Sequence, residues 1–328
     1  MKVVPPGLDP IAIVGTTASG KSAMAMALAR SRGDVELVSV DSMQVYRGMD
    51  IGTAKATTAE RAEVRHHLID VVDPWEPYEV HSFQAAAGGA LADIARRGRR
   101  AVLVGGTGLY LRAVIDGFEI PGRFPDVAVE LEATPDTAEA TARLHARLAT
   151  VDPLGASRME PTNRRRVLRG LEVTLGSGRP FSSFGPGLDA FPPTPVHLVG
   201  IGLPQPVVAE RIEARYRQQM AAGFLDEVRR LAAGPALSHT AAQALGYREL
   251  LAYLRRQQPT DGARAGEEGG GDEALAAALD EAVRRTRRFA RRQRAWFRRD
   301  PRISWLGVGT DALTSMADLE AVVARHWD

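Results

Sequence analysis

The sequence of 328 residues contains no cysteine and no long apolar run. Without cysteine the chain can form neither a disulfide nor a thiolate metal site, which is typical of a cytoplasmic protein. No apolar stretch approaches the roughly 20 residues that cross a bilayer, and residues 1–6 do not resemble a signal peptide. We therefore expect a cytoplasmic protein with no membrane partner.

Lysine is scarce as well: it occurs only at Lys2, Lys21 and Lys55, so 39 of the 42 basic residues are arginine. Arginine is the better bidentate phosphate binder, although a compositional bias towards Ala, Arg and Gly accounts for most of these residues. The net charge is only +2, whereas residues 283–303 carry ten arginines and a single acid. This local excess predicts a polyanion-binding surface along a helix at 273–298.

The clearest motif is Gly-x-x-x-x-Gly-Lys-Ser at residues 15–22. An apolar run precedes it and an alanine-rich helical segment follows, which is the context of a phosphate-binding loop. Gly15 and Gly20 permit backbone conformations in which successive N–H groups point at an anion. Lys21 adds a point charge, and the Ser22 hydroxyl is a candidate ligand for Mg²⁺. The motif predicts a bound phosphate chain without identifying the molecule that carries it.

Two further apolar runs, residues 35–40 and 101–104, lead into polar side chains. Asp41 follows the first run, and a glycine turn with Thr107 follows the second. Because ligands of open parallel sheets bind beyond the carboxyl ends of the strands, both residues are expected beside the phosphate loop. Asp41 could hold a magnesium-bound water, act as a general base or cap the next helix. Thr107 and the amides of its turn could contact an anion.

Strands that alternate with helices predict an α/β fold, a parallel sheet of the phosphate-loop NTPase kind flanked by helices. A short strand is expected at 67–71. The pattern divides the chain into the first part of a catalytic core (1–115), an all-α insertion (116–194) and the second part of the core (195–328). Residues 258–272 have the composition of a surface loop.

Arginines gather at two further places. Arg165, Arg166 and Arg169 begin a helix of the insertion and are close enough to share one surface. A solvated charged face is the ordinary explanation, and phosphate contacts are the alternative. Arg211 and Arg215 lie one turn apart on a helix of the core, where both could reach the phosphate site.

Five motifs in this order resemble those of the tRNA dimethylallyltransferases: residues 15–22, 41–55, 104–110, 243–250 and 286–297. The resemblance covers about residues 11–306. It implies that the loop holds the diphosphate of dimethylallyl diphosphate instead of ATP. It also implies transfer of the dimethylallyl group to the N6 amino group of the adenosine just 3′ of the anticodon, in tRNAs that read codons beginning with U.

The resemblance further implies the roles of single residues, with Asp41 as general base and Thr107 as the residue that positions the leaving group and the tRNA. The residues implied to bind diphosphate are Gly15, Thr16, Thr17, Ala18, Ser19, Gly20, Lys21, Ser22 and Arg215. Those implied to contact tRNA are Asp41, Ser42, Met43, Gln44, Thr107, Arg165, Arg166, Val167, Leu168, Arg169, Gln243, Ala244, Leu245, Gly246, Tyr247 and Arg248. The implied cofactor is Mg²⁺ at Ser22, and the implied partners are a tRNA anticodon stem-loop, clamped by the insertion, and dimethylallyl diphosphate. A monomer suffices for this chemistry.

Two other functions use the same motifs. A small-molecule or nucleoside kinase would use the loop for ATP and predicts ATP turnover. An RNA-binding protein with a vestigial loop predicts that Lys21→Ala leaves function intact.

Overall fold

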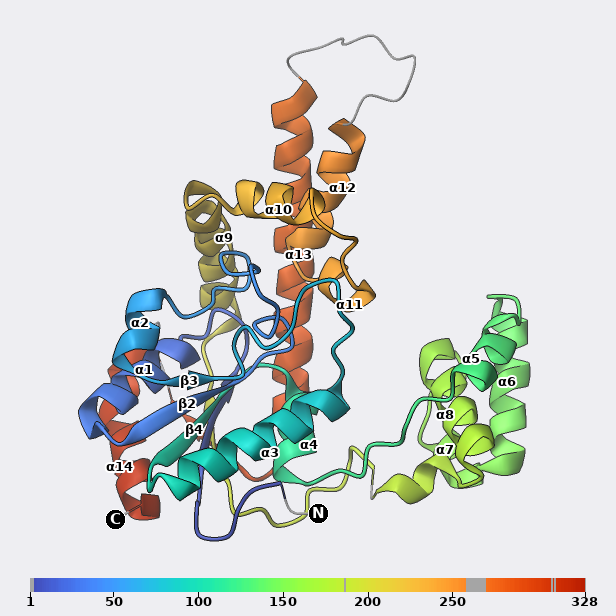
Figure 1. The fold of residues 1–328 in the computed structure, drawn as a ribbon, viewed down its shortest axis with the longest axis horizontal. Helices are drawn as coiled ribbons and strands as arrows, with labels where there is room; N and C mark the ends of the chain where they lie inside the picture. The colour runs from blue at the N-terminus through green and yellow to red at the C-terminus, as the bar shows by residue number, and fades with distance from the viewer. Residues whose placement is uncertain (1–2, 186, 258–269, 308, 310, 328) are drawn as a thin grey trace. The chain divides into compact units, whose positions relative to one another are not determined.

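The computed structural model describes residues 3–185, 187–257, 270–307, 309 and 311–327 (Figure 1). The chain divides into two compact units, one made of Met1–Gly117 with Pro193–Asp328 and the other of Phe118–Pro192. Each division lies two residues from the one expected from the sequence. The first unit contains the phosphate-loop motif and the arginine-rich helix.

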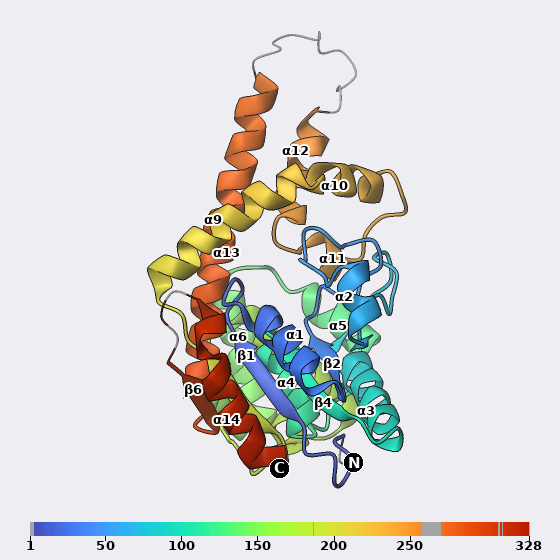
Figure 2. The same cartoon turned by 90° about the vertical axis from the view of Figure 1, so that its left-hand side faces the viewer.

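Within the described residues, the first unit is built on a six-stranded parallel sheet in the order β3-β2-β4-β1-β5-β6 (Figures 1 and 2). Its strands are β1 (Ile11–Gly15), β2 (Val35–Val40), β3 (His66–His67), β4 (Arg100–Gly105), β5 (His197–Ile201) and β6 (Ile303–Leu306). The central strands are mostly apolar and buried along their length, as a parallel sheet covered by helices on both faces requires. The predicted α/β fold is confirmed.

Helices cover both faces of this sheet: α1 and α14 lie on one face, and α3 and α4 on the other (Figure 2). The helices of the first unit are α1 (Lys21–Arg32), α2 (Thr58–Glu63), α3 (Val80–Arg96), α4 (Gly108–Ile115), α9 (Gln205–Ala221), α10 (Phe224–Ala232), α11 (His239–Ala242), α12 (Tyr247–Gln257), α13 (Gly270–Arg298) and α14 (Met316–Trp327), with the short 3-10 helix η2 (Ala312–Ser315). Helix α13 contacts α9, α12, α4 and β1. Its buried stripe contains Thr286, Ala290, Gln293 and Phe297, whereas Val283 is only partly buried.

The predicted strand at 67–71 is wrong in extent, because β3 consists of His66–His67 alone. Leu68 and Asp70 have positive φ angles of 63° and 57°, which no strand permits, so the chain turns immediately after His67. Val72, the first residue after the predicted range, forms only an isolated bridge with Tyr46.

The expected surface loop at 258–272 lies mostly outside the described residues. Its last three residues, 270–272, are instead the first turn of α13. Asp272 and Glu273 favour a helix start there, because their negative charges face the positive end of the helix dipole. Among the described helices, none combines the length and apolarity that crossing a bilayer demands.

The second unit is all-α, as predicted. It consists of α5 (Pro125–Glu132), α6 (Ala138–Val151), α7 (Pro153–Ser157) and α8 (Arg164–Ser177), followed by the 3-10 helix η1 (Phe181–Phe184). Thr137, Asp152 and Asn163 cap three of these helices by accepting backbone N–H groups. Its separate core contains Leu131, Leu144, Leu148, Ala156, Met159, Val167 and Leu171.

Gly105, at the end of β4, is a position at which the sheet leaves no room for a side chain. A Cβ there would overlap backbone atoms of Val40 on the neighbouring strand. We expect Gly105→Ala to lower the free energy of unfolding by at least about 2 kcal/mol, because backbone atoms cannot move aside as a flexible side chain does. Urea unfolding followed by circular dichroism measures this.

The matched control is Gly89→Ala in α3, where a Cβ meets nothing within 4 Å. We expect this change to stabilise the protein by roughly 0.5–1 kcal/mol, because alanine has the higher helix propensity. Equal effects of the two substitutions would contradict the packing argument.

Candidate active site

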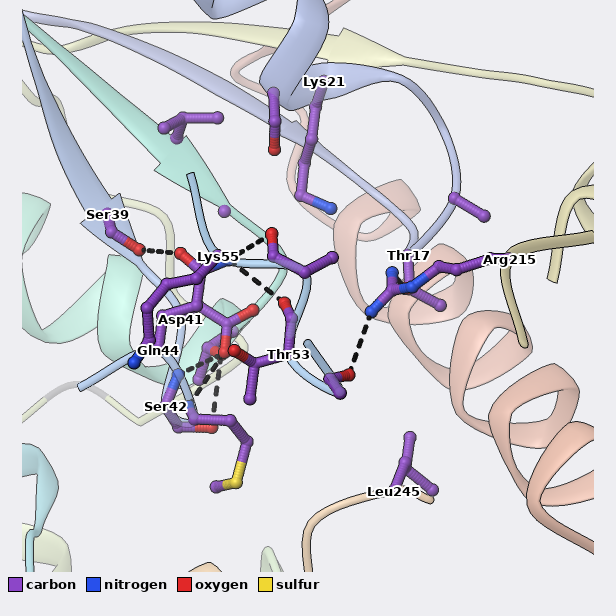
Figure 3. A pocket seen from close by; sticks show the side chains of 18 of the residues that line it. Thr17, Lys21, Ser39, Asp41, Ser42, Gln44, Thr53, Lys55, Arg215 and Leu245 are labelled. Carbon is purple, nitrogen blue, oxygen red and sulfur yellow. Dashed lines mark hydrogen bonds between the residues drawn. The ribbon is translucent and has the colours of Figure 1, made fainter. Parts of the chain in front are cut away.

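A cavity of about 600 Å³ lies at the carboxyl ends of the central strands (Figure 3). It is lined by residues that are far apart in the sequence, among them Thr17, Ala18, Gly20, Lys21, Ser22, Asp41, Ser42, Met43, Gln44, Thr107, Arg215, Gln243, Ala244, Leu245 and Tyr247. The structure therefore brings five residues of the predicted phosphate loop, both predicted catalytic residues and four residues of the 243–248 segment to one place, whereas Gly15, Thr16, Ser19, Gly246 and Arg248 are not among the lining residues.

The phosphate loop has the backbone shape that its glycines predict. Gly20 has a φ of 87° and Ala18 a φ of 60°, so the chain bends through left-handed conformations as an anion-binding nest does. A Cβ at Gly15 would lie 2.7 Å from the Ser19 Oγ, which explains the glycine there. Within the described part of the chain, this buried Ser19 Oγ forms no hydrogen bond.

Two cations from different elements reach this loop. Lys21 Nζ donates to the Thr16 carbonyl (3.1 Å), and Arg215 Nη1 on α9 donates to Thr17 Oγ1 (3.0 Å). Figure 3 shows Lys21, Asp41 and Arg215 around one open space. Burial lowers the pKa of Lys21 to about 8, with Asp41 opposing the shift and Arg215 adding to it. Burial also lowers the pKa of Arg215, although a guanidinium remains charged at neutral pH.

Asp41 does not cap a helix, because the next helix begins only at Thr58. Its Oδ1 instead accepts the backbone N–H of Met43 (2.8 Å), which closes a tight turn. Its Oδ2 accepts no hydrogen bond from any residue that the structure describes. The glycine turn at residues 105–108, which contains Thr107, is the second glycine turn of the site. Thr107 Oγ1 accepts the N–H of Ser42 (3.1 Å), so this turn is connected to the residue next to Asp41. One carboxylate oxygen is thus anchored by the backbone, in a residue that lines the cavity.

Glu227, a buried carboxylate on α10, is a residue of the site that no sequence motif revealed. It accepts the backbone N–H groups of residues 50–52, at 2.8–3.2 Å, and the hydroxyl of Tyr247 at 2.6 Å. Gln219 on α9 donates to the carbonyls of residues 51 and 52. The wall of the cavity at 50–53 is thereby fixed to α9 and α10, although nothing in the local sequence of Glu227 signals this.

The second missed residue is Gln293 on α13. Its Oε1 accepts the N–H of Thr17 (2.8 Å) and its Nε2 donates to the carbonyl of Gly106 (2.9 Å). An amide in an otherwise largely apolar helical stripe is the signal that could have identified it.

Gln44, implied as a tRNA contact, uses its side chain inside the protein. Its Oε1 accepts the Ser39 hydroxyl (2.7 Å), and its Nε2 donates to the carbonyls of Thr53 and Ala54. The half-buried amide therefore supports the 50–55 loop.

The 243–248 segment is divided by burial. Gln243 and Arg248 are exposed and hydrogen-bond to each other (2.9 Å), whereas Ala244, Gly246 and Tyr247 are buried. The Tyr247 hydroxyl donates a hydrogen bond to Glu227, so the side chain supports the cavity wall and its hydroxyl is not available to hydrogen-bond with RNA.

The 165–169 segment of the second unit is divided in the same way. Arg165 and Arg166 are exposed, whereas Val167 is buried in the core of that unit and Leu168 packs against it. Arg169 pairs with Glu172 (2.6 Å) and donates to two loop carbonyls. Arg165 and Arg166 are therefore the exposed cations at the start of α8.

Ser22 fits the role of a Mg²⁺ ligand, because it is exposed in the cavity beside the phosphate loop. Among the described residues, no three His, Cys, Asp or Glu side chains are grouped as for a metal held by protein alone. A hydroxyl with few carboxylates suits Mg²⁺, which keeps several waters and binds through substrate phosphates.

The lowered pKa of Lys21 predicts pH-dependent anion binding. A bound diphosphate stabilises the ammonium and raises this pKa, so binding takes up a proton when Lys21 is neutral beforehand. Affinity for inorganic pyrophosphate should therefore lose about tenfold between pH 7 and pH 9 through Lys21 alone. Calorimetry across this range measures the loss.

Lys21→Arg is the matched control, because a guanidinium stays charged throughout this range and pyrophosphate titrates identically in both measurements. An identical pH dependence in the two proteins would show that Lys21 does not control binding.

Comparison with known proteins identifies the family. The family described as "IPP transferase" matches residues 44–300, and the one described as "Isopentenyl transferase" matches residues 9–71. A tRNA dimethylallyltransferase of Nocardioides sp. is 45% identical over 97% of this chain and 96% of its own length. The crystal structure of the tRNA isopentenylpyrophosphate transferase of Bacillus halodurans, 34% identical, covers 96% of this chain and 95% of its own, with a TM-score of 0.65. The cavity, the sheet and these matches agree: the chain belongs to the IPP transferase family of tRNA dimethylallyltransferases.

Proposed function

We propose that this protein transfers a dimethylallyl group from dimethylallyl diphosphate to the N6 amino group of the adenosine just 3′ of the anticodon, in tRNAs that read codons beginning with U. The observation that carries the proposal is the placement of an incompletely bonded carboxylate, Asp41, in the same cavity as the phosphate loop and its two cations. In such a cavity the phosphate loop and its cations can hold a leaving diphosphate while Asp41 accepts a proton from the nucleophile.

The loop, Lys21 and Arg215 act on the diphosphate. As the bond between the allylic carbon and oxygen breaks, its electron pair leaves with the diphosphate. Preorganised cations stabilise that charge best where water is excluded, and both side chains are already directed at the loop by their bonds to Thr16 and Thr17. Mg²⁺ held at Ser22 would supply further charge neutralisation to the leaving group.

Asp41 acts on the adenine amine, which is a weak nucleophile. The N6 nitrogen forms the new bond to the allylic carbon and loses a proton to Oδ2, while Oδ1 stays bonded to Met43 and holds the carboxylate in place. The base has to leave its stack in the anticodon loop to reach this position, at a cost of a few kcal/mol.

The basic surfaces support an RNA substrate. Arg284, Arg288, Arg291 and Arg292 are exposed on α13, and Arg165 and Arg166 on α8. Each phosphate that such a surface neutralises releases counterions and strengthens binding without reading sequence. We propose that the exposed arginines contact the anticodon arm, that Gln243 and Arg248 flank the cavity entrance, and that a monomer suffices.

The test is label transfer from dimethylallyl diphosphate to an anticodon stem-loop with Mg²⁺ and no ATP. We expect transfer by the wild-type protein, and none to a stem-loop in which the target adenosine is replaced. A requirement for ATP, with phosphorylation of an acceptor, would instead support the kinase alternative.

Asp41→Asn should lower kcat by about 10²–10⁴, because the amide keeps the Met43 hydrogen bond but accepts a proton poorly. Single-turnover transfer measures this. Asp226→Asn, a change at an exposed acid on α10 outside the cavity, is the control and should retain wild-type rates. Equal rates in the wild-type protein and Asp41→Asn would show that Asp41 is not the general base.

A further inference from the structure

Gln293 lies between two turns that the proposed reaction needs, and it belongs to neither. We propose, on the basis of the proposed function, that Gln293 is a positioning residue that sets the spacing between the phosphate loop and the second glycine turn. The residue is only 7% exposed, and its side chain hydrogen-bonds to both turns at once.

The direction of the two hydrogen bonds explains why the residue is glutamine. Oε1 accepts the N–H of Thr17, and Nε2 donates to the carbonyl of Gly106. Glutamate has no donor for the second bond, and methionine has neither group. A Cβ at Gly106 would overlap Nε2, so the turn lies directly against the amide. The distance between the turns is thus specified from both sides by one side chain.

Each turn is connected to a side chain that the proposed mechanism uses. The phosphate loop carries Lys21, and Gly106 precedes Thr107, whose Oγ1 holds the N–H of Ser42 beside Asp41. A shift of the second turn would therefore change the separation between the leaving diphosphate and the carboxylate. A misplacement of about 1 Å can cost about a hundredfold in rate.

The remainder of α13 supports the same arrangement. Trp296 packs so closely on Gly108 that a Cβ there would overlap its ring. Thr286 hydrogen-bonds with the hydroxyl of Tyr216 (2.9 Å), the neighbour of Arg215 on α9. One helix therefore sets three parts of the cavity from its buried side and presents arginines on its exposed side. RNA bound to those arginines would contact the element that fixes the catalytic spacing.

Gln293→Met is the test, because it keeps the volume and removes both hydrogen bonds. We expect kcat for transfer to fall about a hundredfold, while the Kd for inorganic pyrophosphate with Mg²⁺ changes less than threefold, since the loop itself remains intact. Gln293→Leu also removes both hydrogen bonds without adding a charge beside the phosphate loop, and it should show the same split between kcat and Kd. It also serves as the second variant should the methionine protein fail to fold.

Leu279→Ala is the control for a purely structural effect, because Leu279 packs against the core from the same helix and does not line the cavity. It should lower the melting temperature and leave kcat unchanged well below the transition. A kcat within threefold of wild type in folded Gln293 variants, a parallel loss of pyrophosphate affinity, or an equal kcat loss in Leu279→Ala would each overturn the proposal. Absence of transfer by the wild-type protein would refute the proposed function instead, and the pyrophosphate measurement does not depend on it.

Discussion

The parallel pairing of β4 with both β1 and β2 is the constraint on which the active site depends. Its register sets Gly105 opposite Val14 on one side and opposite Val40 on the other. Three strands therefore end at one level, and the segments that follow them, the phosphate loop, Asp41 and the Thr107 turn, start from a common edge. The absence of a side chain at Gly105 permits the close approach of the strands.

Buried polar side chains then fix the segments that the sheet does not hold. Glu227, Gln293 and Lys55 each satisfy several backbone or side-chain groups, and each connects segments that are separate in the fold. Burying a charge is costly unless it is paired and hydrogen-bonded, and the partners of Glu227 and Lys55 meet that condition. The cavity walls are consequently held by hydrogen bonds between separate segments at the points where the phosphate loop and the 50–55 loop meet the helices.

Local sequence patterns predicted most of the fold, because an apolar run or a glycine turn indicates the backbone conformation of the residues that form it. The phosphate loop, Asp41 and Thr107 were predictable for that reason. The strand expected at 67–71 was not, since the positive φ angles of Leu68 and Asp70 have no local signal, and Asp70 is paired with Lys55 and Arg61 from other segments. Glu227 was equally hidden, because its backbone partners lie about 175 residues away. Tyr247 was expected to contact RNA, yet its ring is buried and its hydroxyl donates to that same hidden carboxylate.

The near-absence of lysine gives the cavity an unusual chemical selectivity. Lys55 is 1% exposed in its side chain and its ammonium is held by Tyr46, Asp50 and Asp70, while Lys2 lies outside the described residues. Burial lowers the pKa of Lys21 to about 8, so more of this amine is uncharged near neutral pH than of an ordinary lysine. An amine-directed acylating reagent would thus find, among the two described lysines, a nucleophile only within the phosphate loop.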